Sequence, residues 1–231
     1  MHRFDRLWSQ RAWRALIVCV ACSAVSACAS PNLYATARAL RRGQVQHTVA
    51  LEGVGAVYPE AAYLPSLPTY QLRVGVAERT DIGVRIANAT SLGVDARVEL
   101  VRGAVDVAVV PGLQGTYVPF SGGPPGLLYG HVPIVVALHP SDRATLVLTG
   151  GVTWGVTLGR AAVHSNTVSM PVARDATDSG VALRVGVALA ARVHPRLRLF
   201  PEVTALVTPE TGRTTLTTGF GFQWGALDES Q

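Results

Sequence analysis

Apolar and polar residues alternate with a period of two along most of this chain. In the segment 181–193, Val181, Leu183 and Val185 begin a row of apolar residues on one parity, and small or charged residues occupy the other. Successive side chains of a β-strand point to opposite faces, so this pattern predicts strands with one apolar face. Ten segments show it, namely 44–58, 69–77, 81–88, 92–101, 105–117, 127–138, 144–158, 180–193, 197–207 and 213–224. We therefore expect an all-β protein.

The connections between these segments differ in length in a regular way. The even-numbered connections are all short, at 78–80, 102–104, 140–143 and 194–196. The long connections are all odd-numbered, at 59–68, 118–126 and 159–179, although two further odd-numbered ones, 89–91 and 208–212, are short. Outer-membrane barrels have an even number of strands, short periplasmic turns and longer outer loops. The chain is thus predicted to be an antiparallel up-and-down transmembrane β-barrel of about ten strands.

The amino terminus has the composition of an export signal. Four arginines precede an uncharged apolar run over residues 15–25, which ends in small residues. This run is shorter than the roughly 20 residues that a membrane-spanning helix needs. We therefore expect residues 1–27 to be a cleaved signal peptide.

The sequence Val25-Ser26-Ala27-Cys28 resembles the lipobox of bacterial prolipoproteins. The resemblance implies that Cys28 is lipidated and becomes the new N-terminus. It also implies an outer-membrane destination, because Ala29 stands where an inner-membrane retention signal would have aspartate. The alternative is an ordinary secretory signal in which Cys28 is incidental. Cys19 and Cys22 lie inside the signal, so their CxxC spacing is not interpreted as a redox or metal motif.

The predicted organisation is a signal peptide over 1–27, an N-terminal tether over 28–43, a barrel domain over 44–224 and a C-terminal tail over 225–231. The last strand, 216–224, resembles the C-terminal strand of outer-membrane proteins, from which the tail departs. Loss of the signal removes four arginines and Asp5, which lowers the formal charge from +5 to +2. A nucleic-acid partner is not expected.

Charged residues on the polar parity are expected to face the lumen. The predicted charge network consists of Arg73, Arg85, Asp95, Arg97, Glu99, Asp106, Arg184, Arg192 and Glu202, and Glu52, His131 and Arg198 share this parity. A buried charge without a partner costs several kcal/mol, so we expect cross-strand ion pairs that fill the interior. Glycine, alanine and threonine also dominate the polar parity, which suits a crowded lumen better than a solvated surface.

The sequence favours a structural or passive outer-membrane barrel lipoprotein that is not an enzyme and has no cofactor or metal. Its expected partners are outer-membrane lipid and the machineries of export and barrel insertion. One alternative is a lipid-tethered periplasmic β-domain that binds an apolar ligand or partner. A second is a lipid-modifying outer-membrane enzyme, for which His139-Pro140-Ser141-Asp142 and His164-Ser165 offer the residue types. Adjacent residues of one turn do not readily form an oriented triad, so no catalytic residue is assigned.

Overall fold

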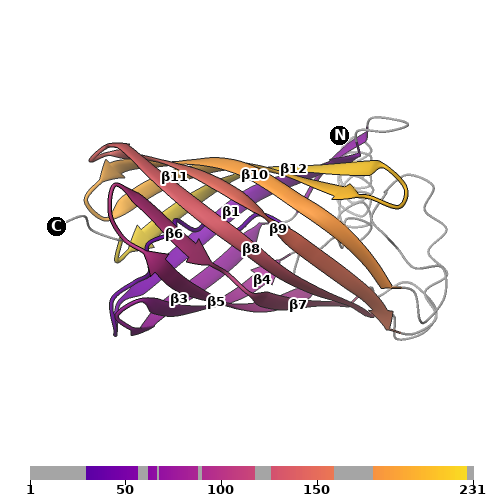
Figure 1. Cartoon of the computed structure of the whole chain (residues 1–231), viewed down its shortest axis with the longest axis horizontal. Helices are drawn as coiled ribbons and strands as arrows, with labels where there is room; N and C mark the ends of the chain where they lie inside the picture. Colours follow the sequence, from indigo (N-terminus) through magenta and orange to yellow (C-terminus); the bar gives the residue numbers. More distant parts are fainter. Residues whose placement is uncertain are drawn as a thin grey trace, which may run out of the picture.

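The computed structural model describes residues 30–56, 62–66, 68–87, 90–117, 126–158 and 179–227. They form one antiparallel sheet that closes on itself where β1 (Val45–Ala56) pairs with β12 (Arg213–Gly225). Figure 1 shows the resulting barrel from the side, with its strands tilted against the long axis. In the described residues no helix is both long and apolar enough to cross a membrane.

The remaining strands follow around the barrel in chain order, with antiparallel pairing between adjacent strands. They are β2 (Ala62–Pro65), β3 (Thr69–Ala77), β4 (Thr80–Ala87), β5 (Ser91–Val101), β6 (Val105–Val109), β7 (Gly112–Tyr117), β8 (Gly126–Ser141), β9 (Ala144–Leu158), β10 (Ser179–His194) and β11 (Leu197–Thr208). Because β6 and β7 lie end to end between β5 and β8, and β2 pairs only with β1, the described residues form a barrel of ten strands. The predicted fold class is confirmed.

Two details differ from the sequence prediction. The predicted strand 105–117 is divided into β6 and β7 at Val110 and Pro111, where proline has no N–H to donate to a ladder. The chain stays tied to both neighbours there, because Val110 N–H donates to Pro133 O at 2.9 Å and Ala96 N–H donates to Pro111 O at 2.9 Å. The predicted loop 59–68 contains the short strand β2.

The two faces of the barrel have opposite character. The apolar parity faces outward, and its largest exposed fractions are 62% at Val185, 59% at Leu92 and 56% at Leu51. In β12 the outward residues include Phe220, Phe222 and Trp224. The polar parity faces inward and is buried, with side chains such as Arg73, Arg97 and Arg184 among the most enclosed of the described residues. The molecule is therefore polar inside and apolar outside.

The two ends of the barrel are distinct. The short-turn end carries the links β3–β4, β5–β6, β8–β9 and β10–β11 and also the end of β12, and it lies at the left in Figure 1. The opposite end is here called the long-loop end. There β7 ends and β8 begins, and β9 ends and β10 begins.

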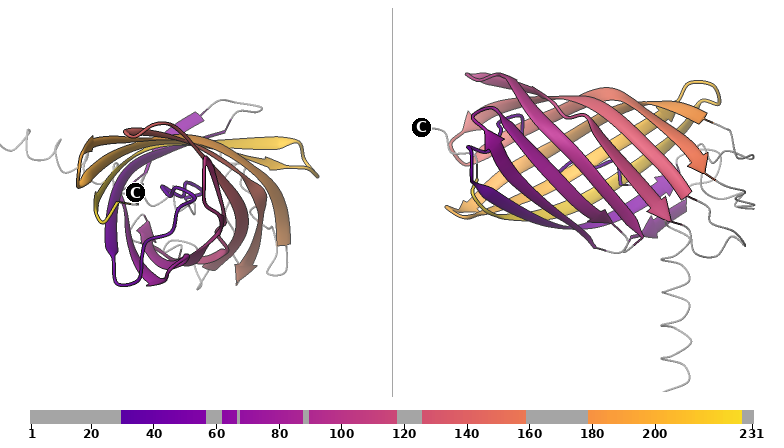
Figure 2. Two further views of the ribbon diagram at one scale, coloured as in Figure 1. Left: turned by 60° about the vertical axis from the view of Figure 1, so that its left-hand side comes forward. Right: turned by 90° about the horizontal axis from the view of Figure 1, so that it is seen from below.

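Residues 30–40, here called the N-terminal insert, lie inside the barrel. Figure 2 shows this indigo segment within the ring of strands when the molecule is viewed toward one end. Arg38 is half-buried and the other insert residues are buried. A turn over 41–44 leads from the insert into β1, with Gln44 N–H donating to Arg41 O at 3.0 Å. Gly43 has a φ of 82°, which suits glycine in such a turn. Within the predicted tether 28–43, residues 30–40 are packed in the lumen and residues 41–43 are exposed in the turn.

We expect the folded barrel to resist SDS because its seam is closed by a full antiparallel ladder between β1 and β12. Detergent-extracted mature protein should migrate faster on an SDS gel before boiling than after it. Identical migration of the two samples would contradict a closed, detergent-stable barrel.

Candidate functional site in the barrel lumen

The centre of the lumenal charge network is Asp81 in β4. Its carboxylate pairs with Arg73 of β3 on one side and with Arg97 of β5 on the other, where Arg97 Nε donates to Oδ2 at 2.8 Å. Arg73 also pairs with Asp95 of β5. The register aligns Arg73, Gly83 and Asp95 across the three strands. A Cβ at Gly83 would lie 2.9 Å from both Arg73 Nη2 and Asp95 Oδ1, so glycine there makes room for the pair.

A second group of charges lies across the lumen on β10 and β11. Arg184 Nη2 lies 3.4 Å from Glu202 Oε1. The same carboxylate accepts the backbone N–H of Leu33 at 2.8 Å and that of Tyr34 at 2.7 Å. Glu202 thus binds both the wall and the N-terminal insert.

The C-terminal half of the insert is bound by wall side chains near the short-turn end. The N–H of Ala39 donates to Glu99 Oε2 at 2.9 Å, and that of Leu40 donates to Asp81 Oδ2 at 2.9 Å. Arg97 Nη1 donates to Thr36 O at 2.8 Å. The insert has no strand partner in the described residues, so these side chains satisfy backbone groups that would otherwise be buried at a cost.

The N-terminal half of the insert is bound farther along the barrel. Ser30 Oγ donates to Glu52 Oε1 at 2.6 Å, and Glu52 also accepts from Thr69 Oγ1 at 3.1 Å. Arg85 donates to the carbonyl oxygens of Ser30, at 3.2 Å, and Leu33, at 3.3 Å. Wall carboxylates therefore receive insert N–H and O–H groups, while wall guanidinium groups donate to insert carbonyls.

Tyr34, the largest side chain of the insert, packs against Gly219 and Gly221 of β12. A Cβ at Gly221 would lie 2.8 Å from Tyr34 Cδ1, and one at Gly219 would collide with the tyrosine hydroxyl. The ring also meets Phe200, the cross-strand neighbour of Gly221, edge-on, with centroids 6.1 Å apart. Gln223 donates to the carbonyl oxygen of Tyr34. The two glycines thus leave space for the Tyr34 ring, and Gln223 binds its backbone carbonyl.

The structure distributes the predicted network residues as follows. Ion pairs join Arg73 to Asp95, Arg97 to Asp81, and Arg184 to Glu202. Glu99 pairs with Arg102, and Asp106 pairs with Arg38 at 2.9 Å. Arg85 donates to carbonyl oxygens of the insert, and Arg192 is half-buried at the short-turn end. Cys28 lies outside the described residues.

Asp81 and the insert are the lumenal components that sequence reasoning missed. Asp81 is completely buried and shares its parity with Arg85 four positions later, which was an available signal. It is the first residue of the predicted strand 81–88, directly after the predicted turn 78–80. No local signal marks the insert as lumenal, because its partners lie up to 189 positions away.

A cavity of about 270 Å³ opens at the short-turn end. Its lining is predominantly basic, and its charged or titratable members are Arg38, His139, Asp142, Arg143, Arg192 and Arg198. This surplus of guanidinium groups favours anions over cations at this mouth.

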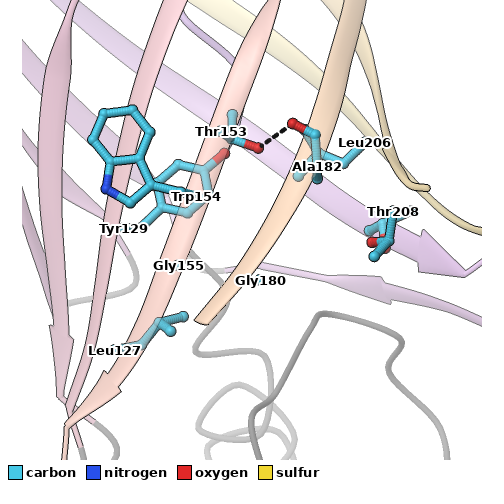
Figure 3. Close-up of a pocket in the computed structure, with 10 residues that line it drawn as sticks. Leu127, Tyr129, Thr153, Trp154, Gly155, Gly180, Ala182, Leu206 and Thr208 are labelled. Atoms are coloured by element: carbon cyan, nitrogen blue, oxygen red, sulfur yellow. Dashed lines mark hydrogen bonds between the residues drawn. The ribbon is translucent and has the colours of Figure 1, made fainter. Parts of the chain in front are cut away.

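A much smaller gap, about 20 Å³, lies among β8 to β12 toward the long-loop end. Figure 3 shows Tyr129, Thr153 and Trp154 around it, with the Thr153 hydroxyl donating to Ala182 O at 3.1 Å. It has room for about one water molecule, so it is no site for an organic ligand.

His139 and Ser141, the residue types of the lipid-modifying enzyme hypothesis, each bond to other partners. His139 Nε2 contacts Asp106 Oδ2 at 2.6 Å, and its Nδ1 contacts Thr145 Oγ1 at 3.1 Å. Ser141 Oγ instead accepts the N–H of Ala144 at 3.1 Å within the turn. His164 and Ser165 lie outside the described residues. The described part of the chain holds no group of three metal-ligating side chains.

The barrel is similar to outer-membrane proteins of known structure. Ail, the attachment invasion locus protein of Yersinia pestis, is 11% identical over 80% of this chain and 99% of Ail, with a TM-score of 0.39. The translocator domain of the autotransporter NalP from Neisseria meningitidis is 10% identical over 78% of this chain and 88% of its own, with a TM-score of 0.44. Neisserial surface protein A is 8% identical over 79% and 96% of the two chains, with a TM-score of 0.38. These likenesses concern the fold alone.

Neither a protein-family model nor a curated protein sequence matches the chain.

Replacing Asp81 with asparagine should destabilise the barrel strongly. The substitution leaves two buried guanidinium groups without their shared carboxylate, and breaking a buried pair in this way costs about 3–5 kcal/mol. The measurement is the urea concentration at which the fast-migrating unboiled band disappears. Asp142→Asn in the exposed β8–β9 turn is the matched control and should leave that midpoint unchanged. Equal midpoints for the two variants would show that the Asp81 pairs do not hold the lumen together.

Proposed function

We propose that this chain is an outer-membrane barrel lipoprotein with a structural, non-catalytic role. The polar-inside, apolar-outside distribution supports a barrel surrounded by lipid, since a soluble barrel buries its apolar faces and shows polar ones to water. The outer face exposes Leu51, Leu92 and Val185, while arginines fill the interior. This is the observation that argues against a lipid-tethered periplasmic β-domain. Membrane lipid and the machineries of export and barrel insertion are the partners that this role requires.

The lumen in this proposal is closed to diffusion. Buried side chains from the wall meet the N-terminal insert, and Glu202, Asp81 and Arg97 bind its backbone directly. A segment held by charge-assisted hydrogen bonds at many points occupies the path that solutes would take. The sequence predicts a lumen filled by ion pairs alone. In the structure, residues 30–40 also occupy the lumen. The binding of the insert backbone by wall charges is the observation that carries the closed state.

Conductance across a planar bilayer tests the closed lumen. The complete mature protein should give no steady current steps, whereas a variant lacking residues 30–40, with Ala29 joined to Arg41, should give steps when it retains heat modifiability. The shortened variant has the same wall and the same anchor site, so it is the matched comparison. Stable steps from the complete protein would overturn the closed lumen.

Metabolic labelling with palmitate tests the lipid anchor, which rests on the sequence Val25-Ser26-Ala27-Cys28. Cys28→Ala should abolish incorporation, because only the lipobox cysteine accepts the diacylglycerol. Cys22→Ala, within the signal, should leave it intact. The Cys28→Ala protein should still show the fast-migrating unboiled band, since the barrel strands are unchanged. Equal labelling of the two variants would contradict the anchor.

A further inference from the structure

The N-terminal insert runs through the lumen in one definite direction. Its last residue, Leu40, is bound by Asp81, the second residue of β4, at the short-turn end. Its first described residue, Ser30, is bound by Glu52 and Arg85. Glu52 in turn binds Thr69, the first residue of β3, and Arg85 lies two residues before the end of β4, so both mark the long-loop end of their side of the barrel. Going backward along the chain, the insert therefore passes from the short-turn end toward the long-loop end.

The barrel wall fixes this direction at separate points. Asp81 and Glu99 bind Leu40 and Ala39 near the short-turn end. Farther along the insert, Glu202 binds Leu33 and Tyr34, and Glu52 binds Ser30. Glu202 and Glu52 are both in register with Gly219 of β12. Reversing the segment would remove each carboxylate from the N–H or O–H that it accepts. The glycines under Tyr34 add a steric match at one height only.

The reach of the chain then limits where Cys28 can be. Only Ala29 lies between Cys28 and Ser30. The two steps from Cys28 to Ser30 span at most about 7 Å when fully extended. The apolar band of an outer-membrane barrel is about 25 Å tall. While Ser30 remains bound to Glu52, Cys28 cannot reach the membrane face on the short-turn side.

We propose that the insert threads the mature N-terminus through the barrel and presents Cys28 and its lipid at the long-loop mouth, on the cell-surface side. This inference rests on the proposed lipidation of Cys28. The strands beside the first residues of the insert are short, so the barrel wall extends less far there. β3 and β4 have 9 and 8 residues, whereas β8, β9 and β10 have 16, 15 and 16. The acyl chains pass over this low rim into the outer leaflet. The lipid anchor and the short turns thus belong to opposite sides of the membrane.

Epitope accessibility in intact cells tests the threading. A short epitope is inserted between Ala29 and Ser30 in the full chain, which keeps the lipobox. Two reference proteins carry the same epitope, one between Asp142 and Arg143 at the short-turn end and one between Glu210 and Thr211 at the long-loop end. We expect antibody to bind the N-terminal epitope on intact cells to the level of the 210–211 reference. Binding only after permeabilisation, as for the 142–143 reference, would overturn the threading.

A displaced insert supplies a second measurement. Gly219→Val puts a side chain where the Tyr34 hydroxyl lies, so it should expel the insert and make the N-terminal epitope reachable only after permeabilisation. Gly150→Val is the matched control, because an added Cβ there meets nothing within 4 Å, and it should keep the epitope on the surface. Adding Tyr34→Ala to Gly219→Val should restore surface exposure. An epitope that stays on the surface in the Gly219→Val protein would show that the docked insert does not determine its position.

Palmitate labelling of the same epitope-bearing proteins separates the two proposals. A labelled protein whose epitope needs permeabilisation refutes the threading and leaves the lipoprotein intact. An unlabelled protein whose epitope is on the surface refutes the lipid at Cys28 and with it the presentation of a lipid, while the path of the insert stands.

Discussion

Asp81 accepts from three residues at once: the guanidinium groups of Arg73 and Arg97 from the neighbouring strands, and the backbone N–H of Leu40 from the insert. One carboxylate therefore joins three strands of the wall to the segment that they enclose. A charge so fully removed from water is tolerated because every side of it meets a compensating group. The rest of the lumen repeats this arrangement, with Glu202 binding Arg184 and two insert N–H groups.

The inverted distribution of polarity explains why such compensation is needed. The inward face of the strands carries arginines, carboxylates and amides, with glycines where space is short. A buried apolar cluster that includes Leu33, Val135 and Phe200 lies beside them. Gly83 admits the pair of Arg73 and Asp95, and Gly219 admits Tyr34. Small residues in the lumenal rows therefore mark places where a larger partner from another strand or from the insert occupies the volume.

The strands could be predicted closely from the sequence, because a period of two is a local property and a one-residue shift would turn every side chain to the wrong face. The lumenal position of residues such as Arg184 and Glu202 follows from the same parity. What local reasoning could not supply were contacts between distant residues. Asp81 was placed at the start of a predicted strand, but its partners Arg73, Arg97 and Leu40 belong to other segments. Residues 30–40 show neither alternation nor helical periodicity, and the wall groups that bind them lie 22 to 189 positions away. The interruption at Pro111 had a visible cause in the sequence that the continuous pattern around it obscured.

The seam of the barrel lies beside the insert, since β1 follows the insert directly and pairs with β12. The last strand to be synthesised contributes Gln223, which binds the insert carbonyl at Tyr34, and the two glycines beneath that ring. Closure of the ring and completion of the contacts around the insert therefore depend on the same strand. A chain that lacks β12 has an open sheet, because β1 has no partner at the seam. It also lacks Gln223 and the two glycines that contact Tyr34. A truncated product therefore carries both defects together.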